Sequence, residues 1–119
     1  IRNRISAIYK KWHCQILLAE QNSIGSVNIE KLQDDGLQVN SFDTTNLSKA
    51  SVMSTLHEEL HSGNLQLQDW SVLKHEMNIF VSSQTPSGLW RLAAEEGGHD
   101  DTVIALALAL RSLQEWFFT

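Results

Sequence analysis

Several residues and patterns that mark common classes of protein are scarce or absent from this sequence of 119 residues. It has a single cysteine, Cys14, so no internal disulfide can form, which fits a reducing cytosol. No run of about 18 apolar residues occurs, so no membrane span is expected, and no signal-peptide pattern is present. The glycine-rich loop that holds ATP phosphates is missing, as is the glycine-flanked serine of α/β-hydrolases. The length allows one domain, which we expect to span residues 1–119.

Positive charge is also in short supply, because 14 acidic residues outnumber nine basic ones and the net charge is −5. A free-standing DNA-binding protein is usually basic, since neutralisation of phosphates supplies much of its affinity. Strong DNA binding by this chain alone is therefore not expected. What the chain does have is hydrophobic residues, 42% of the total, which is enough for a core. We expect its four tryptophans to be core or edge residues rather than a platform for stacking bases.

The spacing of apolar residues predicts an alternation of helices and strands, which favours a parallel α/β layer. A polar turn is expected at Gln21–Ser23 and a very short strand at Leu65–Leu67. Asn46 or Ser48 should cap the third helix and Gly63 should end it. The last helix should be largely buried, because apolar residues cover most of its circumference. The expected helices span residues 2–12, 27–33, 46–61, 69 or 71 to 78, and 100–116, and the expected strands span residues 15–20, 37–42, 79–83 and 89–93.

Three carboxylates stand where metal ions are often bound in proteins. Glu20 ends a predicted strand, and ligands of open α/β sheets bind at the carboxyl ends of strands, although a solvated strand-end carboxylate fits the pattern equally well. Asp100 and Asp101 open the last helix, where one aspartate would suffice to cap free N–H groups. The second aspartate, beside Gly97-Gly98-His99, suggests a metal site. Two or three oxygen ligands at the end of a sheet suit Mg²⁺ or Mn²⁺.

A second metal-binding pattern lies in the third predicted helix. His57-Glu58-Glu59-Leu60-His61 matches the HExxH motif, in which two histidines bind Zn²⁺ and the glutamate acts as general base. A small zinc hydrolase using His57, Glu58 and His61 is therefore an alternative, with Glu76 as the candidate third ligand. Charged Glu59 stands where zinc proteases usually have an uncharged residue. The opposing interpretation is an amphipathic helix whose core-facing residues are Val52, Met53, Leu56 and Leu60.

Five segments, in order along the chain, resemble motifs of the nuclease domain of tailed-phage terminase large subunits, which cut DNA during packaging. The match is closest at Gly97–Ala109, which is similar to the final acidic motif and helix of that family. The other four resemble an acidic strand end with its glycine-containing turn, a Thr-Thr turn followed by lysine, a short strand and a hairpin turn. They are Leu18–Gly25, Phe42–Lys49, Ser62–Leu67 and Gln84–Gly88.

The resemblance implies an incomplete RNase H-like α/β fold that lacks the first strands of its sheet. In that family, carboxylates from the first strand, the end of the fourth strand and the start of the last helix hold divalent metal ions. Glu20 matches the second place and Asp101, or Asp100, the third. The first-strand aspartate would lie before Ile1, so we expect a fragment, a split gene product or a prophage remnant with little activity of its own. Its substrate would be double-stranded DNA, bound by the full-length protein in the cytoplasm of a bacterial host.

The missing strand has a physical consequence for the predicted sheet. The first strand of an RNase H-like sheet lies beside the fourth, so the apolar edge of Gln15–Glu20 would be unpaired. Such an edge pairs readily with another chain, which predicts a homo-oligomer or a partner chain that supplies the missing strands. The alternative function is then a non-catalytic interaction module on the same scaffold. Lys49, which follows the Thr-Thr turn, could contact a phosphate, although such a lysine is usually only solvated.

Overall fold

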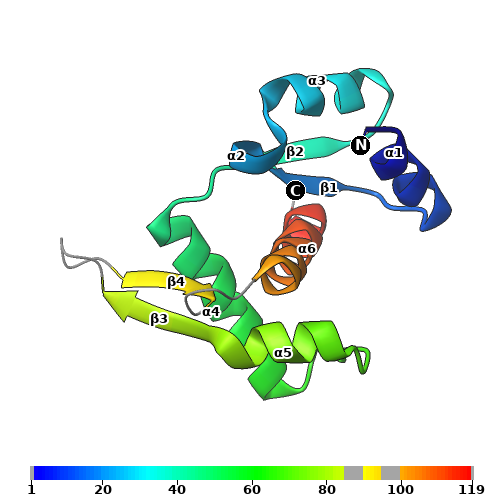
Figure 1. Cartoon of the computed structure of the whole chain (residues 1–119). Helices are drawn as coiled ribbons and strands as arrows, with labels where there is room; N and C mark the ends of the chain where they lie inside the picture. The colour runs from blue at the N-terminus through cyan, green and yellow to red at the C-terminus, as the bar shows by residue number, and fades with distance from the viewer. Residues whose placement is uncertain (1, 85–89, 95–99, 119) are drawn as a thin grey trace. The chain divides into compact units, whose positions relative to one another are not determined.

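A computed structural model describes residues 2–84, 90–94 and 100–118 of the chain (Figure 1). Contacts divide the chain into two compact units. Unit 1 comprises Ile1–Thr44 and Leu108–Thr119, and unit 2 comprises Thr45–Ala107. Within the described residues, none of the helices combines the length and the apolarity that crossing a bilayer requires.

Unit 1 is built on two short parallel strands, β1 (Leu17–Glu20) and β2 (Val39–Phe42). Leu17 pairs with Val39 and Glu20 with Phe42, so the predicted parallel α/β layer is confirmed as a two-stranded sheet. Three helices of this unit, drawn in blue to cyan in Figure 1, accompany the strands. They are α1 (Arg2–Lys11), α2 (Gln21–Ile24) and α3 (Ser26–Asp34).

The short helix α2 replaces the polar turn that was expected at Gln21–Ser23. Its single turn is closed by the backbone N–H of Gly25, which donates to the Gln21 carbonyl. Gly25 has a φ of 83°, a conformation that costs glycine little because it has no Cβ atom. The glycine therefore ends α2 and lets α3 begin at once, in a different direction.

The core of unit 1 lies between α3 and the parallel strands. Leu32 of α3 has no exposed surface, and Ile29 is 5% exposed, as their helical spacing predicts. Val27, expected on the same apolar face, is instead 62% exposed. Ile5 and Tyr9 of α1 pack against the cluster from outside. The buried members of this core are Ala19, Ile29, Leu32, Leu37 and Val39.

Unit 2 begins with the long helix α4 (Asn46–Ser62), which has a cap at each end. Its N-cap is Thr45, so neither Asn46 nor Ser48 occupies the predicted cap position. Ser48 still contributes, because its hydroxyl accepts from the Thr45 N–H while its own N–H donates to Thr45 Oγ1. At the other end Gly63 adopts a left-handed φ of 78°, which confirms the predicted stop.

The remainder of unit 2 contains α5 (Ser71–Ile79) and an antiparallel pair of strands, β3 (Phe80–Gln84) and β4 (Trp90–Ala94). The predicted hairpin strands are thereby confirmed, whereas Thr85–Gly88 in its turn lies outside the described residues. The very short strand expected at Leu65–Leu67 does not form. This segment holds two leucines only, and without a neighbouring strand so short a segment gains no backbone pairing.

The last helix, α6 (Asp101–Phe118), begins in unit 2 and ends in unit 1. Among its described side chains only Val103, Ala107 and Leu108 are buried, so the expectation of a largely buried helix was wrong. Leu113, for instance, is 51% exposed. The helix follows the ordinary rule that one stripe of an amphipathic helix is covered, despite its apolar composition.

Two tryptophans also depart from expectation. Trp12, directly after α1, is 70% exposed, and Trp70, directly before α5, is 49% exposed. The sequence predicted core or edge residues, and neither tryptophan lies in the core, where burial would bring one of the largest gains in apolar area. Burial in the core therefore does not account for the presence of tryptophan at position 12.

Candidate functional site

Glu20 occupies the position that the sequence predicted, at the carboxyl end of β1. It pairs in register with Phe42, the last residue of β2, so both strands end at the same edge of the sheet. The carboxylate is half-buried, and its Oε1 accepts a hydrogen bond of 3.0 Å from the Ser23 hydroxyl. A carboxylate has about four lone-pair sites for hydrogen bonds or metal ions, so most of its capacity is left over.

A second contact braces this edge of the sheet. Asn22 of α2 donates through Nδ2 to the backbone carbonyl of Thr44, two residues beyond β2, at 3.4 Å. Thr44 also carries a buried hydroxyl oxygen with no hydrogen-bond partner among the described residues. A buried polar atom without a partner is costly, so native proteins keep few of them. The carboxyl edge of the parallel pair is thus polar and incompletely satisfied.

Asp100 and Asp101 lie at the start of α6, but they differ in surroundings. Asp100 is half-buried and its carbonyl accepts from the Ile104 N–H at 3.0 Å, the first bond of the helix. Its carboxylate lies 3.4 Å from Nζ of Lys49 in α4, with both side chains largely covered. Asp101 is exposed and borders a hollow of about 440 Å³ together with Trp70, Leu73 and Thr102.

The capping role that could have explained the two aspartates belongs to Glu76 of α5. Its Oε1 accepts from both the backbone N–H and the hydroxyl of Thr102, each at 2.8 Å. Glu76 is buried, with 8% of its surface exposed. Because this carboxylate already accepts from the Thr102 N–H in the first turn of α6, that N–H does not need Asp100 or Asp101 as a side-chain cap. No pattern in the sequence predicts this contact, which joins residues 26 positions apart.

Lys49 also has a partner in this region that the sequence did not predict. It was expected to be solvated or to contact a phosphate, and instead its ammonium pairs with Asp100. Its side chain is 20% exposed, so the pair is shielded more than a surface ion pair. The capping box at Thr45 and Ser48 fixes the first turn of α4, from which Lys49 extends.

The HExxH motif lies on α4, where His57 and His61 are one turn apart and their rings stand edge to face, with centroids 4.3 Å apart. Both histidines and Glu58 are exposed. The proposed third ligand, Glu76, is committed to Thr102. In the part of the chain that the structure describes, no group of three or more His, Cys, Asp or Glu side chains is arranged to hold a metal ion.

The described residues therefore give no support to the zinc-hydrolase alternative, and they agree with the opposing interpretation of an amphipathic helix. Val52 and Leu56 of α4 are 1% and 2% exposed, and Met53 and Leu60 are half-buried. His57 and His61 are exposed, and His57 lies at the margin of the apolar face, where it borders a hollow with Met53 and Leu60. The helical spacing of the apolar residues carried more information here than the five-residue motif.

Known proteins provide an independent comparison. No protein-family model matches the sequence, and no curated protein is significantly similar to it. The structure, however, matches that of the large terminase nuclease from thermophilic phage G20c with a TM-score of 0.81 and 24% sequence identity. The match covers 91% of this chain and 58% of that one.

Two further crystal structures of the same nuclease match equally well. The form with bound magnesium has a TM-score of 0.80 and 24% identity, and covers 90% of this chain and 57% of that chain. The form with bound cobalt has a TM-score of 0.80 and 25% identity, and covers 91% and 58%. The chain therefore has the fold of a large terminase nuclease, and it spans less than two thirds of that nuclease's length.

Proposed function

We propose that this chain is the later part of the nuclease domain of a phage terminase large subunit, a divalent-metal-dependent DNA endonuclease of the packaging machinery. The observation that carries the proposal is the match over nine tenths of the chain to one such nuclease. The five sequence motifs that resemble this family point the same way. Double-stranded DNA, acted on by the full-length protein in the bacterial cytoplasm, is the substrate that the proposal implies.

The metal ligands of the proposed enzyme would be Glu20 and Asp101, together with Asp100. Magnesium and cobalt bind the similar nuclease, which supports Mg²⁺ or Mn²⁺ as the cofactor here. The donors suit such ions, because hard cations take carboxylate oxygens. Two observations support the assignment: Glu20 accepts only one described hydrogen bond, from Ser23, and Glu76 frees the aspartates from capping.

The two aspartates would then have different tasks. Asp101, exposed at the first turn of α6, is the better candidate for direct ligation. Asp100 is held by Lys49 at 3.4 Å, so it would position that ammonium as well as add negative charge. Bound divalent ions would supply the Lewis acidity for phosphodiester hydrolysis, by activating a water molecule and stabilising the leaving oxygen. Lys49 Nζ would add positive charge close to the phosphate that is cut.

The site of this chain would be incomplete. The proposed fold is RNase H-like, and the ligand from its first strand is not among these 119 residues. We therefore propose that the chain binds metal weakly and cuts DNA poorly unless that strand is supplied. In the described residues β1 pairs with β2 alone, so its other edge could take a strand from a longer form of this chain, a second copy or a partner chain.

Metal binding tests the proposal without requiring a complete enzyme. Mn²⁺ titration, followed by loss of the electron paramagnetic resonance signal of the free ion, should give saturable binding by the wild-type chain. Each of Glu20→Ala and Asp101→Ala should weaken Mn²⁺ binding strongly. Loss of a group that only supports a ligand costs roughly 10–100-fold in metal affinity, and loss of a ligand should cost at least as much. Glu30→Ala, which removes an exposed carboxylate of α3, is the matched control and should leave binding unchanged.

Plasmid nicking in Mn²⁺ tests the claim of incompleteness separately. We expect little or no cutting by the isolated chain, and any residual nicking should disappear in Glu20→Ala and Asp101→Ala. Robust cutting by the isolated chain would show that its ligand set is already complete. Wild-type Mn²⁺ binding that neither substitution weakens would refute the assignment of the ligands.

A non-catalytic interaction module is the second candidate, and the single pairing of β1 is the observation that favours it. Such a module would keep the fold and lose the chemistry. It predicts a stable oligomer in light scattering together with no saturable binding of Mn²⁺ or Mg²⁺. A monomer that binds Mn²⁺ would exclude it.

A further inference from the structure

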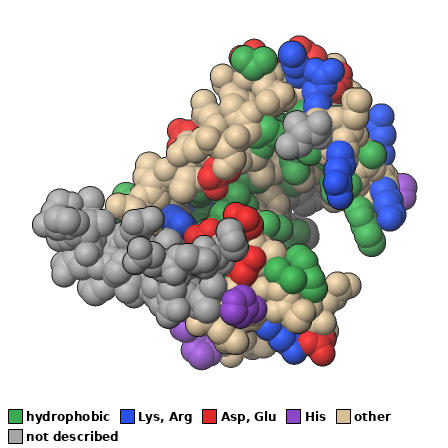
Figure 2. Space-filling view, in the orientation of Figure 1, with side chains coloured by type: hydrophobic (Ala, Val, Ile, Leu, Met, Phe, Trp, Pro, Cys, Tyr) green, Lys and Arg blue, Asp and Glu red, His purple; other side chains and the backbone are tan. Residues whose placement is uncertain are grey.

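Basic residues are concentrated at the start of this acidic chain. Arg2, Arg4, Lys10 and Lys11 are four of the nine basic residues, and all of them precede the first acidic residue, Glu20. Every one of the 14 acidic residues lies in residues 20–119, with the five remaining basic ones. Figure 2 shows the lysine and arginine side chains, in blue, gathered over the α1 end of unit 1. A polyanion would therefore be attracted to α1 and repelled by most of the rest.

The basic side chains of α1 stand on its solvent side. Arg4 and Lys11 are seven residues apart, two helical turns, so they share a face, and Lys10 lies next to that face. All three are exposed. Their separation along the axis, about 10.5 Å for seven residues at 1.5 Å each, is compatible with contacts to different phosphates of one strand.

The opposite side of α1 fixes the helix to unit 1. The Tyr9 hydroxyl donates to the Gln15 carbonyl and accepts from the Gln38 N–H, each at 3.3 Å. Arg2 lies 3.6 Å from Asp35, so this cation is already paired within the chain. The exposed basic face is thus presented by a helix whose position in unit 1 is set by several contacts.

Helix stability does not explain where these charges lie. Lys10 and Lys11 are in the last turn, where cations interact favourably with the helix dipole. Arg4, however, is near the start of the helix, where positive charge is unfavourable, and it forms no ion pair with the described residues. Arg4, Lys10 and Lys11 therefore place exposed positive charge near both ends of the helix.

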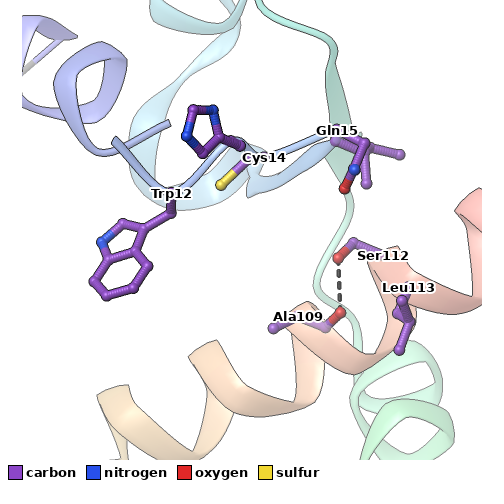
Figure 3. A pocket seen from close by; sticks show the side chains of 8 residues that line it. Trp12, Cys14, Gln15, Ala109, Ser112 and Leu113 are labelled. Carbon is purple, nitrogen blue, oxygen red and sulfur yellow. Dashed lines mark hydrogen bonds between the residues drawn. The ribbon is translucent and has the colours of Figure 1, made fainter. Parts of the chain in front are cut away.

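Trp12 adds an aromatic surface at the end of this basic face. Its side chain is 70% exposed, and Lys11 Nζ lies 5.5 Å from the centroid of its ring. Trp12 also borders an open hollow of about 330 Å³, whose opposite wall comes from Ala109, Ser112 and Leu113 of α6 (Figure 3). An exposed indole beside cations and a hollow is the arrangement on which unpaired bases stack in proteins that bind single strands.

We propose that Arg4, Lys10, Lys11 and Trp12 bind single-stranded DNA, with the cations on its phosphates and one unpaired base on the indole of Trp12. An acidic peptide would satisfy the cations but would leave the flat face of Trp12 unused, and a paired base is not free to stack there. The choice of DNA over RNA rests on the proposed function. None of the four residues belongs to the proposed metal site, so the two sites are chemically separate.

Fluorescence anisotropy tests this proposal with a labelled oligodeoxynucleotide of mixed sequence and with the same sequence in a blunt duplex. EDTA is present throughout, so that binding is measured without metal. The test variant carries Lys10→Glu and Lys11→Glu together. The control variant carries Lys31→Glu and Lys74→Glu, which change the net charge by the same amount at exposed positions of α3 and α5. The α1 pair should weaken single-strand binding tenfold more than the control pair and lower the salt slope by about 1.4, at about 0.7 per phosphate.

Trp12→Ala tests the stacking contact by itself. It should weaken binding of the single strand about fivefold or more, the effect of losing one stacked base, and change duplex binding much less. Trp12→Phe should recover part of the loss. Circular dichroism of each variant reports whether α1 and the rest of the chain stay folded.

Three results would overturn the proposal. They are equal losses in the two charge-reversed pairs, an equal effect of Trp12→Ala on the single strand and the duplex, and no single-strand binding by the wild type at low salt. If the α1 pair instead abolished self-association and left DNA binding unchanged, the basic face would serve an acidic protein partner. Failure of Mn²⁺ to bind would refute the metal site but would not touch these measurements.

Discussion

Glu76 of α5 accepts two hydrogen bonds from Thr102 of α6 through the same carboxylate oxygen, one from the backbone N–H and one from the hydroxyl, each 2.8 Å long. A buried acidic side chain from another helix therefore satisfies the first turn of α6. This contact fixes the segment that carries Asp100 and Asp101. It also means that neither aspartate has to cap the Thr102 N–H, so Asp100 can pair with Lys49 and Asp101 remains available for the proposed metal site.

Replacing Glu76 should destabilise the protein. Glu76→Ala removes both bonds and leaves the Thr102 N–H without its partner, which should cost about 1.5–3 kcal/mol for bonds to a charged group. Thr102→Val removes one bond and should cost about 1 kcal/mol. Urea denaturation followed by circular dichroism measures the free energy of unfolding of each variant.

Glu58→Ala is the control for this prediction, because it removes an exposed carboxylate of α4. Its effect should stay within about 0.5 kcal/mol. If Glu76→Ala were no more destabilising than Glu58→Ala, Glu76 would not be the cap of α6, and Asp100 or Asp101 would have to be reconsidered for that role.

The core of unit 1 depends on Leu32, which has no exposed surface among the side chains that surround it. Leu32→Ala should lower the free energy of unfolding by about 2–5 kcal/mol, through lost burial and the cavity left behind. Val27→Ala, on the same helix but 62% exposed, should change it by no more than about 0.5 kcal/mol. Similar effects of the two substitutions would contradict the orientation of α3.

The N-cap of α4 offers a test of local structure. Thr45→Ala removes the hydroxyl that accepts from the Ser48 N–H and should cost about 0.5–2 kcal/mol. Ser54→Ala, in the exposed middle of α4, should be neutral or slightly stabilising, since alanine has the higher helix propensity. Thermal unfolding of both variants under one buffer condition decides whether the cap lies at Thr45.

The ammonium group of Lys49 should compete with a metal ion for the carboxylate of Asp100. Lys49→Met removes a cation 3.4 Å from that carboxylate, so Mn²⁺ affinity should rise about fivefold, from roughly 1 kcal/mol of relieved repulsion in water. Lys31→Met removes an exposed lysine of α3 and should have no such effect. A fall in Mn²⁺ affinity for Lys49→Met would mean that Lys49 mainly holds Asp100 in place for the metal.

Periodic patterns in the sequence predicted those elements whose stability comes from a local face. The helical spacing of Ile29 and Leu32, the stop at Gly63 and the hairpin strands were confirmed because side-chain periodicity and glycine conformation act within a few residues. Glu20 falls at a strand end for the same reason. The fold resemblance likewise came from motifs whose order along the chain is visible in the sequence.

Tertiary contacts decided the features that the sequence did not reveal. Glu76 caps α6 across 26 residues, and no short pattern announces such a partner. Leu65 and Leu67 alternate like a strand but have no strand to pair with, so they remain irregular. Trp12 was expected to be a core or edge residue, and its position after the last turn of α1 leaves its indole 70% exposed.

The central claim is that Glu20 and Asp101 are ligands of divalent metal, and paramagnetic broadening of backbone amide signals by substoichiometric Mn²⁺ tests it most directly. The proposal predicts that amides at the end of β1 and at the start of α6 broaden first, that Glu20→Gln abolishes the effect at the end of β1, and that Asp101→Asn abolishes it at the start of α6. Broadening confined to one of these segments, or centred elsewhere on the chain, would contradict the claim.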